Sequence, residues 1–400
     1  MSIVKFAPAM ARLGTETAFE VLVRARALEA KGRKIVHLEI GEPDFETPEN
    51  VRRAAQKALN EGWTHYGPSA GLPQARAAVA EEVSRTRGIK VAPEEVIVTP
   101  GGKPVMFLAL LALAGPGDEV LYPNPGFPIY ESMINFCGAK AVPLPIREEN
   151  DFNFDPAEFE ALLTPKTRLV ILNSPANPTG GVMGRDSLER VVRALARFPD
   201  AMVLTDEIYS RILYEGEHLS LASWPGMKER CIILDGFSKT FAMTGWRLGY
   251  GVARRELIDA MAKLATNCYS CTPSFAQIAA IEALTGPQDA VKTMVAEFRR
   301  RRDAIVAGLN QLPGFTCRNP KGAFYAFPNV RGTGLKSKVL ADTLLDRAGV
   351  ACLAGTAFGA EGEGYLRFSY ANSVENIQAA LESMRLVLPE LTANQTALKS

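Results

Sequence analysis

The 400-residue sequence lacks the features that would place it among membrane, nucleic-acid-binding or secreted proteins. Lys and Arg total 45 against 44 Asp and Glu, so the net charge of +1 gives no overall field that would attract nucleic acid or an anionic membrane. No apolar run approaches the roughly 20 residues that a membrane-spanning helix needs. The first eight residues also lack the apolar stretch of a signal peptide, so we expect a cytoplasmic protein that acts on small, near-neutral molecules.

Cysteine and histidine are scarce, with six and three residues in the whole chain. Cys268 and Cys271 form the only Cys-x-x-Cys pair, and no second pair or nearby histidine completes the roughly four ligands of a structural zinc site. We therefore expect no bound metal, and we interpret the cysteines as reduced and mostly buried thiols.

Short apolar runs alternate with helical stretches between Glu95 and Val252. The strand-like runs are residues 96–99, 119–122, 169–172, 202–205 and 231–234. This alternation predicts an α/β fold in which a mostly parallel sheet is covered by helices on both faces. Beyond Ala253 helices dominate, and the length allows two domains. We expect a large domain of residues 46–291 and a smaller α/β domain made of residues 1–45 and 292–400.

The stretch from Leu234 to Tyr250 places Lys239 in a loop of small residues between two strand-like runs. Gly236 and Ser238 allow a ligand to approach the backbone and a hydroxyl group closely, and Arg247 offers a planar guanidinium that suits a phosphate. A lysine, a hydroxyl and an arginine at this spacing suggest a phosphorylated aldehyde cofactor.

A second phosphate-binding feature follows the strand-like run of residues 96–99. Gly101 and Gly102 precede a helix predicted over residues 105–114, and the free backbone amides of a helix N-terminus favour a phosphate. Ligands of such sheets bind at the carboxyl ends of the strands, which is where these glycines and Lys239 fall.

The segment from Gly236 to Gly249 closely resembles the lysine signature of the class I and II aminotransferases, the pyridoxal-phosphate family of the aspartate aminotransferase type. Further similar motifs occur over nearly the whole chain, at residues 41–45, 66–76, 124–130, 173–181, 205–209 and 366–371. The resemblance implies a fold type I enzyme that holds pyridoxal 5'-phosphate on Lys239 as a Schiff base. It also implies a ping-pong exchange of the amino group between an L-amino acid and a 2-oxo acid.

The resemblance implies a role for each matching residue around the cofactor. Lys239 is then both the anchor and the proton shuttle, and Asp206 keeps the pyridine nitrogen protonated. Tyr209 and Asn177 hold the phenolic oxygen, and Phe127 stacks on the ring. The expected phosphate ligands are Gly101, Gly102, Ser238, Arg247 and, from the neighbouring subunit of a homodimer with shared active sites, Tyr66.

Arg367 stands in an alternating apolar strand, where a guanidinium without an anion would be costly to bury. The resemblance implies that it binds the substrate α-carboxylate in a bidentate pair, beside Gly41 and Asn177. Lys103 resembles the lysine that meets the distal carboxylate in bacterial and archaeal aspartate aminotransferases, and Thr15 is expected to close over the same group. Aspartate or glutamate then serves as one partner. Lys103 pointing to solvent or assisting the phosphate is the alternative.

Two other functions use the same kind of domain. A C–S lyase or a cyclopropane-carboxylate synthase has the same cofactor set but eliminates a leaving group, and fold analogy does not separate these enzymes from an aminotransferase. A non-catalytic sensor domain of transcription regulators also binds the cofactor. It carries an N-terminal winged-helix segment, for which we expect no room before Gly41.

Overall fold

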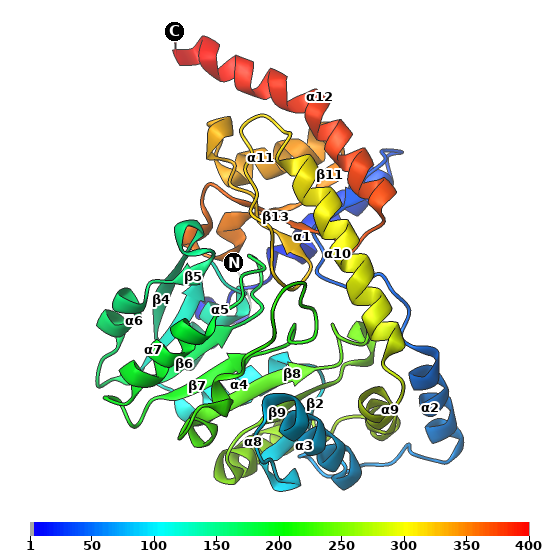
Figure 1. The fold of residues 1–400 in the computed structure, drawn as a ribbon, viewed down its shortest axis with the longest axis vertical. Helices are drawn as coiled ribbons and strands as arrows, with labels where there is room; N and C mark the ends of the chain where they lie inside the picture. The colour runs from blue at the N-terminus through cyan, green and yellow to red at the C-terminus, as the bar shows by residue number, and fades with distance from the viewer. Residues whose placement is uncertain (1–3, 400) are drawn as a thin grey trace.

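The computed structural model describes residues 4–399, with side chains described to residue 391, and has an eight-stranded sheet at its centre (Figure 1). The strand order is β2-β9-β8-β7-β6-β3-β4-β5, and the pairs from β8 to β4 are all parallel. β9 is antiparallel to both of its neighbours, and β5 is antiparallel to β4. The mostly parallel sheet expected from the sequence is confirmed. Its strands are β2 (Val96–Thr99), β3 (Glu119–Asn124), β4 (Lys140–Arg147), β5 (Asn153–Phe154), β6 (Thr167–Asn173), β7 (Met202–Asp206), β8 (Cys231–Gly236) and β9 (Gly249–Val252).

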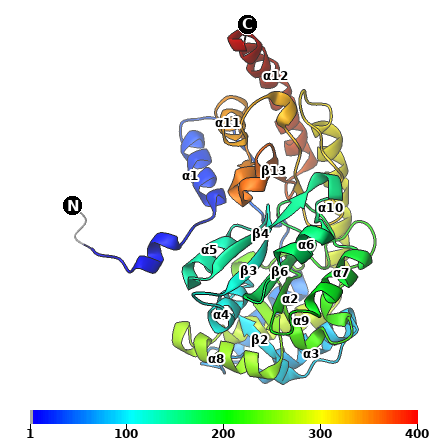
Figure 2. The ribbon, with the colours of Figure 1, turned by 90° about the vertical axis from the view of Figure 1, so that its left-hand side faces the viewer.

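Both faces of this sheet are buried because alternate residues of each strand point to opposite sides. In β6, Val170 and Leu172 pack into one apolar cluster, whereas Leu169 and Ile171 pack into another. Figure 2 shows the two helical layers on either side of the sheet. The first cluster is covered by α2 (Glu49–Asn60), α3 (Pro73–Arg87), α6 (Pro156–Leu162), α7 (Arg185–Leu195) and α9 (Ser274–Thr285), and the second by α4 (Lys103–Leu113), α5 (Ile129–Cys137) and α8 (Arg255–Cys268).

A third apolar cluster lies in the part of the molecule that contains the C-terminal residues, around Phe298, Phe324 and Tyr370. Its strands form a parallel pair, β1 (Val36–His37) with β11 (Val350–Ala351), and an antiparallel sheet in the order β10 (Tyr325–Ala326), β13 (Leu366–Ser369), β12 (Leu353–Ala354). The helices of this part are α1 (Thr17–Glu29), α10 (Asp289–Leu309), α11 (Ser337–Thr343) and α12 (Val374–Lys399). In Figure 1, α10 runs from the large sheet layer up to this smaller unit.

The sequence predicts a helix over residues 48–62 that begins at a Thr47 N-cap, and the structure corrects this expectation. Thr47 is not the cap of α2, which begins at Glu49 after Pro48 without a side-chain cap. The Thr47 hydroxyl instead donates a hydrogen bond of 2.7 Å to the carbonyl oxygen of Ala242. This tertiary hydrogen bond uses the hydroxyl that would otherwise cap the helix. The sequence pattern also gave no sign of β4, because this strand contains Pro143 and Pro145. β5 pairs with β4 only beyond these prolines, so at Pro143 and Pro145 β4 pairs with β3 alone and is an edge strand, where proline is tolerated.

No helix of residues 4–399 combines the length and the apolar character needed to cross a membrane.

Candidate active site

A cavity of about 540 Å³ opens where the carboxyl ends of the central strands meet the smaller unit. This volume is in the range of small-molecule sites. The cavity brings together most of the residues that the sequence predicted: Gly41, Gly102, Lys103, Phe127, Asn177, Asp206, Tyr209, Ser238, Lys239, Arg247 and Arg367. Gly101, Tyr66 and Thr15 do not line it, and Tyr66 is 91% exposed. Within the described residues, no group of three or more His, Cys, Asp or Glu side chains could hold a metal ion.

Lys239 follows β8 in the loop before β9, as the apolar runs of the sequence predicted. Its Nζ donates a hydrogen bond of 2.6 Å to the carbonyl oxygen of Gly41 and lies 5.9 Å from the centre of the Phe324 ring. Burial lowers the pKa of Lys239 to about 8, with Glu42 acting against this shift and Arg367 adding to it. A substantial fraction of the amine is therefore neutral near pH 7–8, which a nucleophile or a base requires.

Asp206 ends β7 and is buried beside the cavity. Its Oδ2 accepts a hydrogen bond of 2.5 Å from the hydroxyl of Tyr130, and its Oδ1 accepts one of 3.2 Å from the backbone N–H of Ile208. Burial raises the pKa of Asp206 to about 6, and both hydrogen bonds oppose that shift. A buried carboxyl group held in this way is suited to pair with a cationic ring nitrogen. Motif comparison did not assign Tyr130 a role, although it ends the Asn124 to Tyr130 motif.

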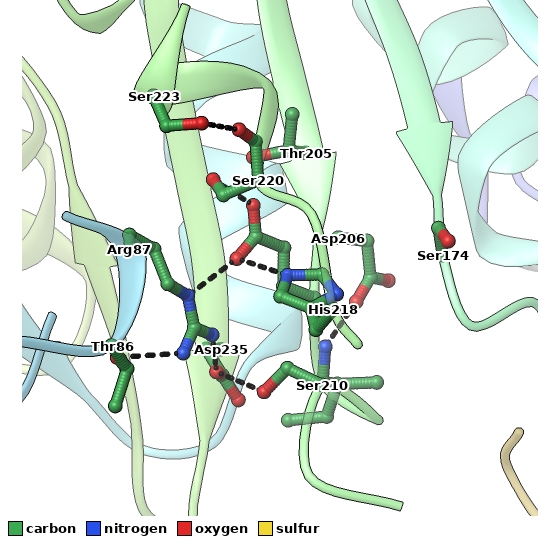
Figure 3. A network of polar contacts seen from close by, with 12 residues as sticks. Thr86, Arg87, Ser174, Thr205, Asp206, Ser210, His218, Ser220, Ser223 and Asp235 are labelled. Carbon is green, nitrogen blue, oxygen red and sulfur yellow. Dashed lines mark hydrogen bonds and ion pairs between the residues drawn. The ribbon is translucent and has the colours of Figure 1, made fainter. Parts of the chain in front are cut away.

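A buried polar network lies next to Asp206, between the ends of β7 and β8 (Figure 3). Arg87 of α3 donates to Glu207 Oε2 at 2.8 Å and to Asp235 Oδ2 at 2.6 Å. Glu207 also contacts His218 and Ser220, at 2.9 and 2.6 Å. Burial alone would raise the pKa of Glu207, but the charges of His218 and Arg87 lower it to about 2. The network fixes the backbone directly after Asp206. Its members come from separate segments, so no motif revealed it.

The turn between β2 and α4 forms a backbone cradle beside Arg247. Gly101 has a φ of +97°, and a Cβ at this position would lie 2.3 Å from Arg247 Nη2. A Cβ on Gly249 of β9 would lie 2.5 Å from the backbone nitrogen of Gly102. Glycine is thus required at position 101 for the Arg247 guanidinium to approach this turn. It is required at position 249 for β9 to approach the backbone that leads into α4. An exposed arginine, the buried Ser238 and free helix amides fit a phosphate group.

Arg367 of β13 is 4% exposed and lies against the rings of Tyr325 and Phe358, at 4.5 and 4.9 Å from their centres. Its Nη1 donates to Asn177 Oδ1 at 3.2 Å and its Nη2 to the carbonyl oxygen of Glu39, whereas Nε has no partner among the described residues. Burial lowers the pKa of Arg367. A buried guanidinium with an unsatisfied N–H and no carboxylate in an ion pair with it, within the described part of the chain, is suited to an anionic ligand.

Two tyrosines, Tyr209 and Tyr325, lie near this arginine and line the cavity. Their hydroxyl groups share a hydrogen bond of 2.7 Å. A Cβ on Gly41 would lie 2.2 Å from the hydroxyl oxygen of Tyr325, so the glycine lets the backbone of residue 41 enter the site. Tyr325 had no role in the sequence prediction, because it lies in a segment without a recognisable motif.

Lys103 begins α4, and its Nζ lies 5.5 Å from the centre of the Phe127 ring. Its ion-pair partner is Glu16, which precedes α1 and also lines the cavity. The prediction for this region named Thr15, the exposed neighbour of Glu16. Glu16 itself was missed, because nothing in the sequence connects residue 16 to residue 103.

Comparison with known proteins gives one consistent result. The family described as aminotransferase class I and II matches residues 33–384. The chain is 41% identical over 372 residues to an aspartate aminotransferase of Pyrococcus horikoshii, covering 92% of this chain and 93% of that relative. It is 40% identical over 360 residues to aromatic-amino-acid aminotransferase 2 of Thermococcus litoralis, covering 89% and 92%. A solved structure of aspartate aminotransferase from Thermus thermophilus with maleate has a TM-score of 0.92 and 38% identity, covering 96% of this chain and 100% of that one.

Proposed function

The chain belongs to the class I and II aminotransferases, fold type I enzymes that depend on pyridoxal phosphate, and we propose here which of its residues perform the reaction and on which substrates. It exchanges an amino group between an amino acid and a 2-oxo acid. When bound, pyridoxal phosphate supplies the aldehyde that takes up the amino group and a pyridine ring that accepts electrons.

The cofactor is assigned to the side of the cavity formed by the strand ends. Gly101, Gly102, Ser238 and Arg247 hold the phosphate, as the backbone cradle beside Arg247 supports. Asp206 pairs with the pyridine nitrogen, and Phe127 lies against the ring. The hydroxyl of Tyr209 and the amide of Asn177 are assigned to the phenolic oxygen, in keeping with their place on the cavity wall.

Lys239 is assigned both the covalent attachment of the cofactor and the proton transfer. Its Nζ, with a pKa lowered to about 8 by burial, loses its proton more readily than an ordinary lysine amine. As a free amine, Nζ would take the proton from the substrate Cα as a general base and would return it as a general acid. The hydrogen bond to the Gly41 carbonyl holds Nζ at the substrate end of the cavity.

The carboxylates of the substrate are assigned to Arg367 and Lys103, the two cationic side chains of the cavity that have no assigned role at the cofactor. Arg367, whose buried Nε lacks a partner, takes the α-carboxylate together with Asn177 and the backbone of Gly41. Lys103 takes the distal carboxylate of aspartate or glutamate, an assignment supported by the Thermus thermophilus relative with maleate, itself a dicarboxylate. Thr15, which adjoins Glu16 outside the cavity, is proposed to join the site only when its segment moves inward.

We further propose a cytoplasmic homodimer with shared active sites. Tyr66 supports the dimer, because a large aromatic side chain that is 91% exposed within one subunit gains burial at an interface. Buried free thiols at Cys231, Cys317 and Cys352 fit a reducing compartment. The proposed domains are residues 46–291 and residues 1–45 with 292–400, a division supported by the apolar cluster around Phe298, most of whose members lie in the second set of residues.

The unpartnered Nε of buried Arg367 carries this proposal, and one experiment tests it. The protein, pyridoxal phosphate and glutamate are mixed, and the absorbance of the bound cofactor is followed before and after adding a 2-oxo acid. We expect formation of 2-oxoglutarate and recovery of the initial spectrum by the added oxo acid. Release of ammonia would instead identify an eliminating enzyme such as a C–S lyase. Arg367→Ala should raise the KM for every amino acid, whatever its side chain.

A further inference from the structure

Glu16 places a negative charge in the cavity directly beside Lys103, and Glu42 is a second carboxylate of the lining near Lys239. Glu16 is the residue before α1 (Thr17–Glu29), its side chain is 19% exposed, and it lines the cavity beside Lys103. Its charge raises the pKa of both Lys239 and Arg367 against the lowering by burial, so its electrostatic effect reaches the proposed proton-transfer group and the proposed ligand of the α-carboxylate.

Lys103 is already neutralised by this carboxylate. Its Nζ forms an ion pair with Glu16 Oε1 and rests above the Phe127 ring. An ammonium group presents a single positive charge, so a substrate carboxylate that arrives at Nζ meets the repulsion of Glu16 unless Glu16 moves away.

We propose that Glu16 determines side-chain specificity by occupying Lys103 until a dicarboxylic substrate displaces it. A substrate without a distal charge leaves the Glu16–Lys103 pair in place and meets a neutral surface. This inference rests on the proposed role of Lys103 as the anchor of the distal carboxylate. It explains how one cavity receives an acidic partner in one half of the exchange and a neutral partner in the other.

The packing around Glu16 keeps the free-energy cost of displacing its carboxylate from Lys103 low. Its side chain makes no capping hydrogen bond to α1, so the helix does not depend on the position of the carboxylate. Ala25 is the only buried residue of α1, and neighbouring Thr15 is exposed. Lys103 by contrast belongs to α4, whose Val105, Met106 and Leu108 are buried. The segment that carries Glu16 is therefore held by fewer buried contacts than the helix that carries Lys103, although the Glu16 side chain is the less exposed of the two.

Binding of maleate to the cofactor-loaded enzyme tests the inference without relying on turnover. Maleate is a dicarboxylate with no amino or oxo group to react, and calorimetry gives its Kd directly. Glu16→Gln should lower the Kd for maleate about fivefold, the effect expected when a competing carboxylate leaves a half-exposed ion pair. The ratio of kcat/KM for glutamate to kcat/KM for phenylalanine should rise by a similar factor.

Glu20→Gln is the matched control. Glu20 lies on the same helix and its loss changes the net charge equally, but it is exposed and does not line the cavity. The Kd of the Glu20→Gln variant for maleate should stay at the wild-type value. An equal gain from both variants would overturn the inference, because it would reveal a general charge effect.

Lys103→Gln separates this inference from the function on which it rests. If Lys103→Gln weakens maleate binding while Glu16→Gln leaves it unchanged or weaker, the inference about Glu16 is wrong and the anchor role of Lys103 stands. If Lys103→Gln leaves maleate binding unchanged, the anchor role itself is wrong and the inference falls with it. In the double variant the gain from Glu16→Gln should shrink, because most of it comes from freeing Lys103.

Discussion

The hydroxyl of Tyr130 donates to Asp206 Oδ2 over 2.5 Å, and both side chains are buried. The bond fixes one carboxylate oxygen and leaves the rest of the group at the cavity wall. It also lowers the pKa of Asp206 against the stronger effect of burial. Tyr130 is therefore a positioning residue for Asp206.

Replacing Tyr130 with Phe should weaken cofactor binding more at pH 6 than at pH 8. Loss of the donor raises the pKa of Asp206 further above about 6, so the carboxyl group is protonated over a wider range and pairs less well with a ring nitrogen. We expect a loss of about 1–2 kcal/mol near pH 6, measured by equilibrium dialysis of pyridoxal phosphate. Tyr269→Phe is the control, since its buried hydroxyl has no partner in the described structure. A pH-independent loss would contradict the prediction.

Asp206→Asn should stabilise the cofactor-free protein above pH 6. The folded-state pKa is raised from 3.8 to about 6, so the folded protein binds more protons than the unfolded chain between these values. The stability that this carboxyl group contributes is full below pH 4 and is lost as the pH rises through 6. The loss is about 3 kcal/mol for two pKa units, and asparagine avoids it. Urea unfolding at pH 4.5 and 8 measures the difference, and a variant with the wild-type pH dependence would refute the assignment.

Lys239→Ala should abolish turnover while leaving a folded protein that binds pyridoxal phosphate without a covalent bond. The phosphate cradle at Gly101 and the carboxyl group of Asp206 do not depend on the lysine. Borohydride, which fixes a lysine-bound aldehyde irreversibly, should then fail to attach the cofactor. Labelling of a different lysine, found by peptide mapping, would show that the anchor lies elsewhere.

Gly101→Ala should weaken cofactor binding at least tenfold, or about 1.4 kcal/mol. The added methyl group would collide with Arg247 at 2.3 Å, in a backbone conformation with a φ of +97° that alanine disfavours. Gly62→Ala separates the two effects, because Gly62 has a similar φ of +82° but open space around its Cβ position. That variant should lose thermal stability and retain cofactor affinity. Similar affinity in both variants would show that the cradle does not bind the phosphate.

Hybrid dimers test whether Tyr66 completes the site of a neighbouring subunit. Tyr66→Phe or Tyr66→Ala should depress activity although the side chain lies outside the cavity of its own subunit. Mixing an inactive Tyr66 variant with Lys239→Ala should restore part of the activity, because some hybrids combine an intact Lys239 with an intact Tyr66 across the interface. A monomer in analytical ultracentrifugation would end the proposal.

The sequence by itself determined the central strands of the sheet, but not β4 and β5, and it determined the residues with a fixed place along the chain. The apolar runs of β6 and β7 are long enough and regular enough to predict buried strands, and β8 and β9 flank Lys239. Asp206 ends β7, and Asn177 and Lys239 come within a few residues of the ends of β6 and β8, so their meeting at the carboxyl edge follows from parallel pairing. All of these features can be predicted from the spacing of residues that lie close together in the sequence.

Only the tertiary structure decided the contacts between distant segments. The network of Arg87 with Glu207 and Asp235 joins residues separated by 120 and 148 positions, and Glu16 reaches Lys103 across 87. No period or motif encodes such pairs, because they arise when helices from different parts of the chain pack on a common sheet. The pKa values of Lys239 and Asp206 likewise depend on burial, which the completed fold produces. The motifs thus identified the candidate catalytic and cofactor-binding residues. The packing of the fold determined the protonation states of these residues and which other groups face the substrate.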